Sequence, residues 1–244
     1  MLKKALILTG VSLSATLMAQ IPEPVNSYQK SYFATVSEGI LSAGNLGKVA
    51  LYDPTKPIPS NVLDFGDQAT PVIRYSTFLH LGEQLHVNFS NTFGFYTGIG
   101  MRNIGMINRL SDSVKVKQRV YSVGIPIALK IGNMGKKTYA AFGAEMELFF
   151  NYKQKTFKGS SGRGEKVEKF NEWFSKRTEL FNPSVFVDFN FGKGSYIKVR
   201  YYLNNFLVQT KQNYTLNNVK YGFFPESSQL FALSFGRVIG AKRK

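Results

Sequence analysis

Apolar and polar side chains alternate along residues 73–89 of the chain. The odd-numbered positions are mostly apolar, while the even-numbered positions are mostly polar and include Arg74, His80 and His86. This alternation predicts a β-strand with one apolar face and one polar face. Strands in soluble domains usually have about five or six residues, whereas a tilted strand needs about 9–11 residues to cross the hydrocarbon of a bilayer. The pattern therefore indicates a strand that crosses a membrane.

The same alternation recurs in seven further segments, which gives eight strands in all. Eight is an even number, as in closed antiparallel barrels of bacteria, and the connections fall into short turns and longer polar segments as those barrels require. The pattern predicts an all-β fold, a transmembrane antiparallel eight-stranded closed β-barrel, with a bulge near Asn103 where the alternation shifts by one residue. The seven further strands are expected at residues 46–53, 93–108, 121–131, 142–152, 182–191, 196–204 and 229–239.

The N-terminus has the pattern of a secretory signal. Lys3 and Lys4 precede an apolar stretch that ends in small residues, and this stretch is shorter and more polar than a membrane-spanning helix. We expect cleavage of this segment on export. The predicted organisation is a signal peptide at 1–19, a periplasmic N-terminal segment at 20–45, the barrel at 46–240 and a basic C-terminal tail at 241–244.

The composition limits the chemistry of the exported chain. It contains no cysteine, so neither disulfides nor thiolate metal sites are available. The formal net charge is +16 at pH 7. Because an exported chain does not meet nucleic acid in the cytoplasm, we expect this charge to face anionic lipid head groups and not nucleic acid.

Charged residues of both signs lie on the polar faces of the expected strands. A soluble β-sandwich or lipocalin-like barrel is the alternative architecture, but it would turn the broad apolar faces inward and leave these charges outside. The lumen of an eight-stranded barrel is filled by side chains, so charges there must pair. The sequence predicts a polar lumen network, with no continuous pore, made by Arg74, Arg102, Glu145, Glu147, Asp188, Lys198 and Arg200.

The residues that most often carry catalysis are sparse. His80 and His86 are the only histidines, and about 20 Å of extended strand separates them, which excludes a shared metal site. The glycines of residues 98–105 do not form a dinucleotide-binding motif. We therefore assign no catalytic, cofactor-binding or metal-ligating residues and expect no cofactor.

The segment 153–181 is the longest expected loop. In its second half, residues 165–180, Phe170, Trp173 and Phe174 recur at helical spacing, which predicts a short helix over the barrel mouth. The alternative is a surface element that contacts lipopolysaccharide or a partner protein through these three aromatic residues.

Together, the signal segment, the alternation, the loop lengths and the C-terminal strand with Phe231, Leu233 and Phe235 resemble the small eight-stranded, porin-like outer-membrane β-barrel family of Gram-negative bacteria. The resemblance covers residues 46–239. It implies location in the bacterial outer membrane after export and signal cleavage, and contact with outer-membrane lipid, lipopolysaccharide and other outer-membrane proteins. Terminal strands of this family usually end in an aromatic residue, whereas this chain continues past Phe235.

The resemblance specifies an architecture and not an activity. We expect an integral outer-membrane protein, not an enzyme, with a structural or interaction role, acting alone or as a small subunit of a larger envelope complex. A lipid A-modifying enzyme and a narrow passive channel are the alternatives.

Overall fold

The computed structural model describes residues 28–52, 63–111, 114–159, 165–208, 213–216, 219–225 and 227–243. All the secondary-structure elements assigned in these ranges are β-strands. Within the same ranges, no helix has the length and apolarity needed to cross a membrane. The predicted signal peptide at 1–19 lies outside the described residues, and its existence stays a prediction.

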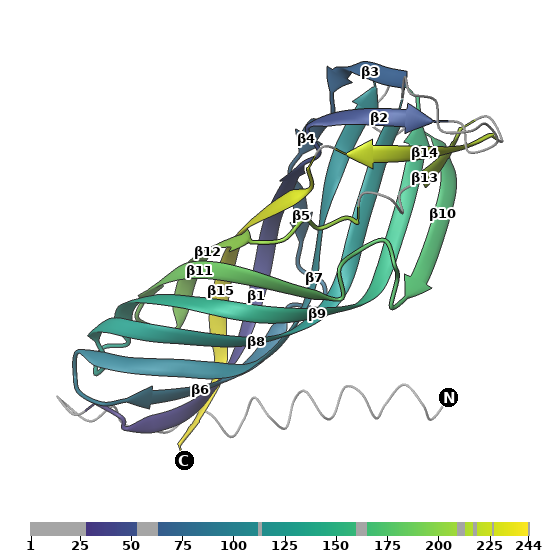
Figure 1. Ribbon diagram of the computed structural model, residues 1–244. Coiled ribbons are helices and arrows are strands. Elements are labelled where there is room, and N and C mark those ends of the chain that lie inside the picture. Colours follow the sequence, from purple (N-terminus) through teal and green to yellow (C-terminus); the bar gives the residue numbers. More distant parts are fainter. Residues whose placement is uncertain are drawn as a thin grey trace, which may run out of the picture.

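Eight antiparallel strands form a closed ring in the lower part of the molecule (Figure 1). β1 pairs with both β15 and β6, and β8 pairs with both β7 and β9, so each strand of the ring has two neighbours. This confirms the predicted fold class. The strands of the ring are β1 (Ser31–Asn45), β6 (Leu81–Asn88), β7 (Phe93–Ser111), β8 (Val114–Asn133), β9 (Thr138–Lys158), β11 (Phe181–Phe191), β12 (Ser195–Tyr202) and β15 (Gln229–Arg243).

The first strand of the ring corrects two expectations. β1 occupies most of the segment 20–45 that was expected in the periplasm. The expected first strand, 46–53, contains β2 (Lys48–Tyr52), which belongs to a separate four-stranded sheet. The alternation in β1 has little contrast, since its inward face is partly apolar and its outward face includes Thr35 and Ser37. The other strands of the separate sheet are β3 (Leu63–Gln68), β13 (Asn213–Leu216) and β14 (Val219–Pro225).

The long strand expected at 73–89 is interrupted. Residues of this segment form β5 (Arg74–Ser76) and β6, and the connection between them contains Leu79 in the left-handed region, with φ of 59°. β5 pairs with β1, while the preceding β4 (Thr70–Val72) pairs with β7. The alternation survives the break because Arg74, His80 and His86 are all buried.

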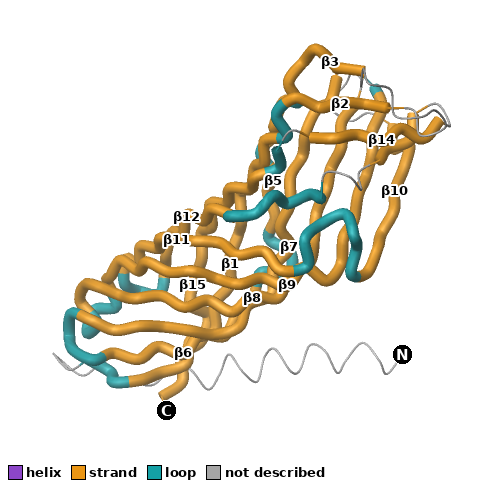
Figure 2. Tube along the Cα trace, in the orientation of Figure 1, coloured by secondary structure: helices purple, strands orange, loops and turns teal. Residues whose placement is uncertain are grey.

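The wall between β7 and β8 is more regular than expected. The predicted bulge near Asn103 is absent from their pairing, whose register shifts only between Arg109 and Ser111. The connection between the strands expected at 93–108 and 121–131 is also shorter than expected, because β7 continues to Ser111 and β8 begins at Val114. Figure 2 shows that the strands continue through most of the upper part of the molecule.

The upper part of the molecule is an extension of the barrel, made by the far ends of β7, β8 and β9 together with β10 (Glu165–Trp173) and the four-stranded sheet (Figure 1). The helix expected in 165–180 is wrong, since β10 pairs with β9 along its length. Inward-facing side chains give the extension its own apolar core, which includes Ile104, Met106, Val116 and Val120. Phe170 of β10 packs against this core.

Short turns connect β6 to β7, β8 to β9 and β11 to β12 at the opposite end of the barrel, and we call this the short-turn end. β15 continues to Arg243 and pairs with the beginning of β1, as in Ala34 opposite Ala241. The expected C-terminal tail at 241–244 is therefore a strand as far as Arg243, and Lys244 lies outside the described residues. Backbone pairing with β1 explains why the chain stays extended past Phe235.

Lys193 lies in one of these short turns with φ of 48°. A residue with a Cβ is destabilised by about 1–2 kcal/mol in this left-handed region of φ, because the Cβ crowds the backbone. Glycine avoids this strain, but its greater loss of conformational entropy on folding costs about 0.5–1 kcal/mol. We expect Lys193→Gly to stabilise the barrel by up to about 1 kcal/mol, as a higher urea midpoint of unfolding in lipid vesicles. Lys136→Gly is the control, because Lys136 has no positive φ and should lose stability. An equal gain in both variants would contradict the explanation.

Candidate functional site

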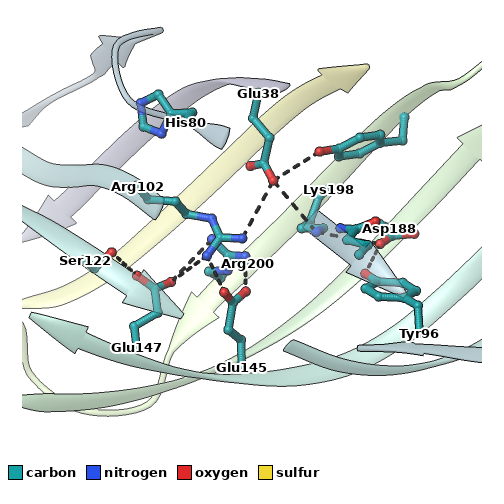
Figure 3. Close-up of polar contacts among 12 residues, drawn as sticks. Glu38, His80, Tyr96, Arg102, Ser122, Glu145, Glu147, Asp188, Lys198 and Arg200 are labelled. Carbon is teal, nitrogen blue, oxygen red and sulfur yellow. Dashed lines mark hydrogen bonds and ion pairs between the residues drawn. The ribbon is translucent and has the colours of Figure 1, made fainter. Parts of the chain in front are cut away.

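Charged side chains from four strands meet in the middle of the barrel lumen (Figure 3). Glu145 of β9 accepts hydrogen bonds from Arg102 of β7 and from Arg200 of β12, the latter with 2.6 Å between Nη2 and Oε2. Glu38 of β1 lies 3.8 Å from Arg102. These side chains are at most 5% exposed. The strands that supply them lie on different sides of the ring, so the cluster bridges the lumen.

Glu147 continues the cluster along β9. Its Oε1 lies 3.6 Å from Arg102 Nη1 and 3.5 Å from Arg200 Nη1. Neutral donors also reach this carboxylate: the Tyr202 hydroxyl donates to Oε1 at 2.7 Å and the Ser122 hydroxyl to Oε2 at 2.5 Å. Both oxygens of a buried carboxylate therefore have partners, which offsets part of its desolvation cost.

A second branch leads from Glu38 towards the short-turn end. Lys198 Nζ lies 4.0 Å from Glu38 and 3.8 Å from Asp188. The Tyr196 hydroxyl donates to Glu38 at 3.1 Å, and the Tyr96 hydroxyl donates to Asp188. We call the connected set Glu38, Arg102, Glu145, Glu147, Asp188, Lys198 and Arg200 the lumen plug.

The structure brings six of the seven predicted network residues into the lumen plug and leaves Arg74 apart. The guanidinium of Arg74 donates to the backbone oxygen of Asn103 at 2.9 Å and to its side-chain oxygen at 2.6 Å. Glu38 was not among the predicted network residues, because residues 20–45 were expected outside the barrel. A single carboxylate between Val36 and Ile40, on the same face of an extended segment, was the available signal.

The outward face of the strands changes character along the barrel. On β8, the outward residues are Lys115, Lys117 and Arg119 in the extension and then become apolar, with Ile125 and Ile127 56% and 63% exposed. The residues of β8 that alternate with these outward-facing residues face inward. Other large apolar side chains exposed on the outside of the ring include Phe93, Ile99, Leu129, Ile131, Phe142, Met146, Val185, Phe189, Val199, Phe231 and Phe235.

This apolar band has the dimensions of a bilayer. Ten residue steps separate Tyr121 from Ile131, and at about 3.3 Å a step with a tilt of about 40° they cover about 25 Å along the barrel axis. An apolar band of this height around a charged interior is the arrangement of outer-membrane barrels. The chain is a small outer-membrane β-barrel. Since short turns of such barrels face the periplasm, we expect the extension of this outer-membrane barrel to face outwards.

Neither a model of a protein family nor a curated protein matches the chain. Among solved structures, the chain is similar to the outer membrane protein OprG from Pseudomonas aeruginosa, with 9% identity over 91% of this chain and 100% of that chain and a TM-score of 0.42. It is also similar to Ail of Yersinia pestis, with 14% identity over 83% and 98% and a TM-score of 0.26, and to Neisserial surface protein A, with 10% identity over 90% and 100% and a TM-score of 0.29.

The two histidines of the outer-membrane barrel lie in different surroundings. His80 lies at the break between β5 and β6, where its Nε2 is 2.9 Å from the Ser76 hydroxyl and its Nδ1 accepts from the Asn103 backbone N–H at 3.5 Å. Because Nδ1 accepts, Nε2 carries the proton in the neutral ring and donates to Ser76. In this tautomer His80 donates to Ser76, four residues earlier, and connects the break between β5 and β6 to β7 through Asn103.

His86 lines a cavity of about 370 Å³ at the short-turn end of the lumen. Its ring stacks on Tyr32, with 4.6 Å between centroids, and its Nδ1 lies 3.3 Å from Lys130 Nζ. Lys137 and Tyr139 also line the cavity. In the described part of the chain, no group of three or more histidine, aspartate or glutamate side chains is placed to hold a metal ion.

The three aromatic residues expected at the surface divide between two environments. Phe170 faces inward against Tyr152, with 6.0 Å between ring centroids. Trp173 and Phe174 are 66% and 62% exposed, at the end of β10 nearest the apolar band. The strand alternation of β10, which replaces the expected helix, sends Phe170 into the core and leaves Trp173 outside.

Proposed function

We propose that the protein is a sealed outer-membrane barrel whose outward extension is an interaction surface, acting alone or as a small subunit of a larger envelope complex. The lumen plug is the observation that carries this proposal. A passive channel needs a continuous wet path, and here the ion pairs of Arg102, Glu145 and Arg200 cross the lumen with almost no exposed surface.

The energetics of the lumen plug support a closed state. Removing one partner from a buried ion pair costs about 3–5 kcal/mol, because a charge is left without compensation. Opening a path between β9 and its opposite strands would separate Glu145 from both Arg102 and Arg200 at once. Thermal motion does not populate such a state appreciably, since each 1.4 kcal/mol lowers a population tenfold.

The extension supports the second part of the proposal. The apolar band alone suffices to hold a barrel in a bilayer. β7, β8 and β9 nevertheless continue well beyond this band and enclose an apolar core of their own. A folded element that anchoring does not require is available for contact with partners, and its exposed Trp173 and Phe174 are of the residue types enriched at interfaces.

Planar bilayer recording tests the seal. We expect the reconstituted barrel to give no discrete conductance steps, and the double variant Arg102→Ala/Glu145→Ala to give small steps, because it removes opposite charges together and shortens both side chains in the plug. Protease protection and heat-dependent electrophoretic migration of the same samples establish that the barrels are inserted and folded. Regular conductance steps from the unaltered barrel would overturn the proposal in favour of a channel.

A further inference from the structure

Five basic side chains form a continuous patch on the outside of the extension, and we call this patch the basic belt. Lys117 of β8 lies directly opposite Lys155 of β9, which in turn lies opposite Lys169 of β10. In the adjacent row, Arg119 of β8 lies opposite Lys153 of β9. Inward-facing residues such as Gln118 and Gln154 alternate with them, so all five side chains point to the outside.

This arrangement is electrostatically unfavourable in the isolated protein. Like charges directly opposite each other on neighbouring strands destabilise a sheet. The pKa of the Lys117 ammonium is lowered, mainly because the group is partly buried. Repulsion by the positive charges of Arg74, Arg119 and Lys155 lowers it further. The pKa of Lys153 is lowered too, first by desolvation and then by repulsion from the positive charges of Arg119, Lys169 and Lys155. A bound anion would relieve the repulsion in both rows.

The basic belt lies next to a row of aromatic rings. Tyr121 of β8, Phe150 of β9 and Trp173 of β10 stack side by side, with 6.4 Å and 5.9 Å between successive ring centroids. Aromatic side chains of this kind mark the boundary between hydrocarbon and water in membrane proteins. Arg119 lies two residues before Tyr121 on β8, and Lys153 lies three residues after Phe150 on the antiparallel β9. Both offsets lead away from the apolar band and place the two basic side chains about 5–8 Å further out for a tilted strand.

The polar head-group region of a bilayer occupies this same depth. The hydrocarbon core is about 30 Å thick and the whole bilayer about 40–45 Å, so each head-group layer is about 5–8 Å deep. Lipid phosphates at this depth attract lysine and arginine. Below the basic belt, the exposed Ile125 and Met146 continue the same outer surface into the apolar band. The surface therefore matches an amphiphile with phosphates above and acyl chains below.

We propose that the basic belt binds the phosphate groups of a phosphorylated glycolipid of the outer leaflet, the lipid A part of lipopolysaccharide, whose acyl chains lie on the apolar band beneath it. This inference rests on the proposed function, since it requires the extension to face outwards, and it gives that interaction surface a lipid partner. The charge of the patch and its continuity with the apolar band favour a membrane lipid over a soluble polyanion, which has no acyl chains to occupy the band.

The test uses the full barrel, refolded in a neutral detergent and titrated with purified bisphosphorylated lipid A, the dephosphorylated lipid and inositol hexakisphosphate. We compare it with the triple variant Lys117→Gln/Lys153→Gln/Lys155→Gln. A matched control, Lys30→Gln/Lys136→Gln/Lys193→Gln, removes the same charge from the periplasmic end. One lysine near an anionic lipid surface contributes roughly fivefold in affinity, so the triple variant should bind bisphosphorylated lipid A on the order of 100-fold more weakly.

The control variant should bind this lipid as the unaltered barrel does, and the dephosphorylated lipid should bind weakly to all three proteins. Equal lipid A affinity in the belt variant and the unaltered barrel would overturn the inference. Inositol hexakisphosphate binding to the belt as tightly as lipid A would also overturn it, in favour of a soluble polyanion.

The belt variant should unfold in lipid-free detergent at no lower urea concentration than the unaltered barrel, because the substitutions relieve repulsion. The belt variant should show no conductance steps in bilayer recording, because its lumen plug is intact. A failure of the lipid A proposal would therefore appear in the binding titration, whereas a failure of the sealed-barrel proposal would appear as conductance steps.

Discussion

Replacing Glu145 by glutamine should lower the free energy of unfolding by about 3–5 kcal/mol, the range for removing one partner of a buried ion pair. The two oxygens of Glu145 accept from different guanidinium groups, one on Arg102 and one on Arg200. Glutamine keeps the shape of the side chain but leaves two buried cations beside a neutral amide. Urea unfolding in lipid vesicles, followed by Trp173 fluorescence, measures the loss.

Glu147→Gln is the matched control for this experiment. Glu147 lies on the same strand and is equally buried, but its ion pairs are longer, at 3.5 Å and 3.6 Å, and it also accepts from the hydroxyls of Tyr202 and Ser122. A glutamine oxygen can still accept from one of these hydroxyls, so the loss should be smaller than in Glu145→Gln. Equal losses in the two variants would show that burial, and not the double pairing of Glu145, sets the cost.

An arginine in place of Ile127 should destabilise the inserted barrel by about 2–4 kcal/mol, as a cation does on the lipid face near the bilayer midplane. Ile127 lies on the outward face of β8, near the middle of the apolar band, and its side chain is 63% exposed. In water such a substitution would cost little, since surface changes usually stay within about 0.5 kcal/mol. In lipid the guanidinium must leave water or distort the bilayer around it.

The control for Ile127→Arg is Thr138→Arg. Thr138 is also exposed, but it begins β9 beside the short turn at the periplasmic end, where an added cation costs about 0–1 kcal/mol. The same urea titration in vesicles measures both variants. A loss at Ile127 no larger than at Thr138 would mean that the outward face of β8 does not meet hydrocarbon.

The sequence alone was sufficient to locate those strands whose two faces differ strongly. The predicted strand at 121–131 lies within β8, because isoleucine, valine and leucine alternate there with serine, glycine and lysine. β1 escaped detection since its inward face carries Tyr32, Ala34 and Ile40, and its outward face is no more apolar. Alternation reports a difference between two environments, so it loses its signal where a strand passes an apolar part of the lumen.

The extension shows the same limit in another form. The spacing of Phe170, Trp173 and Phe174 suits a helix when residues 165–180 are considered alone. The exposed edge of β9 instead offers backbone partners to residues 165–173, and pairing there sends Phe170 into the apolar core. The spacing of the aromatic residues carries no information about this edge. The strand expected at 142–152 also ended too early to reveal it, since β9 continues to Lys158.

The alternation along the chain is enough to predict long membrane-crossing strands and to place charged side chains of both signs on their inward face. Which of these charges meet depends on how the strands pair. Arg102, Glu145 and Arg200 are 43 and 55 residues apart along the chain, and their contacts depend on the register of every strand between them. Register is set by cooperative pairing around a closed ring, and a one-residue slip in one strand would turn its lumen charges towards lipid.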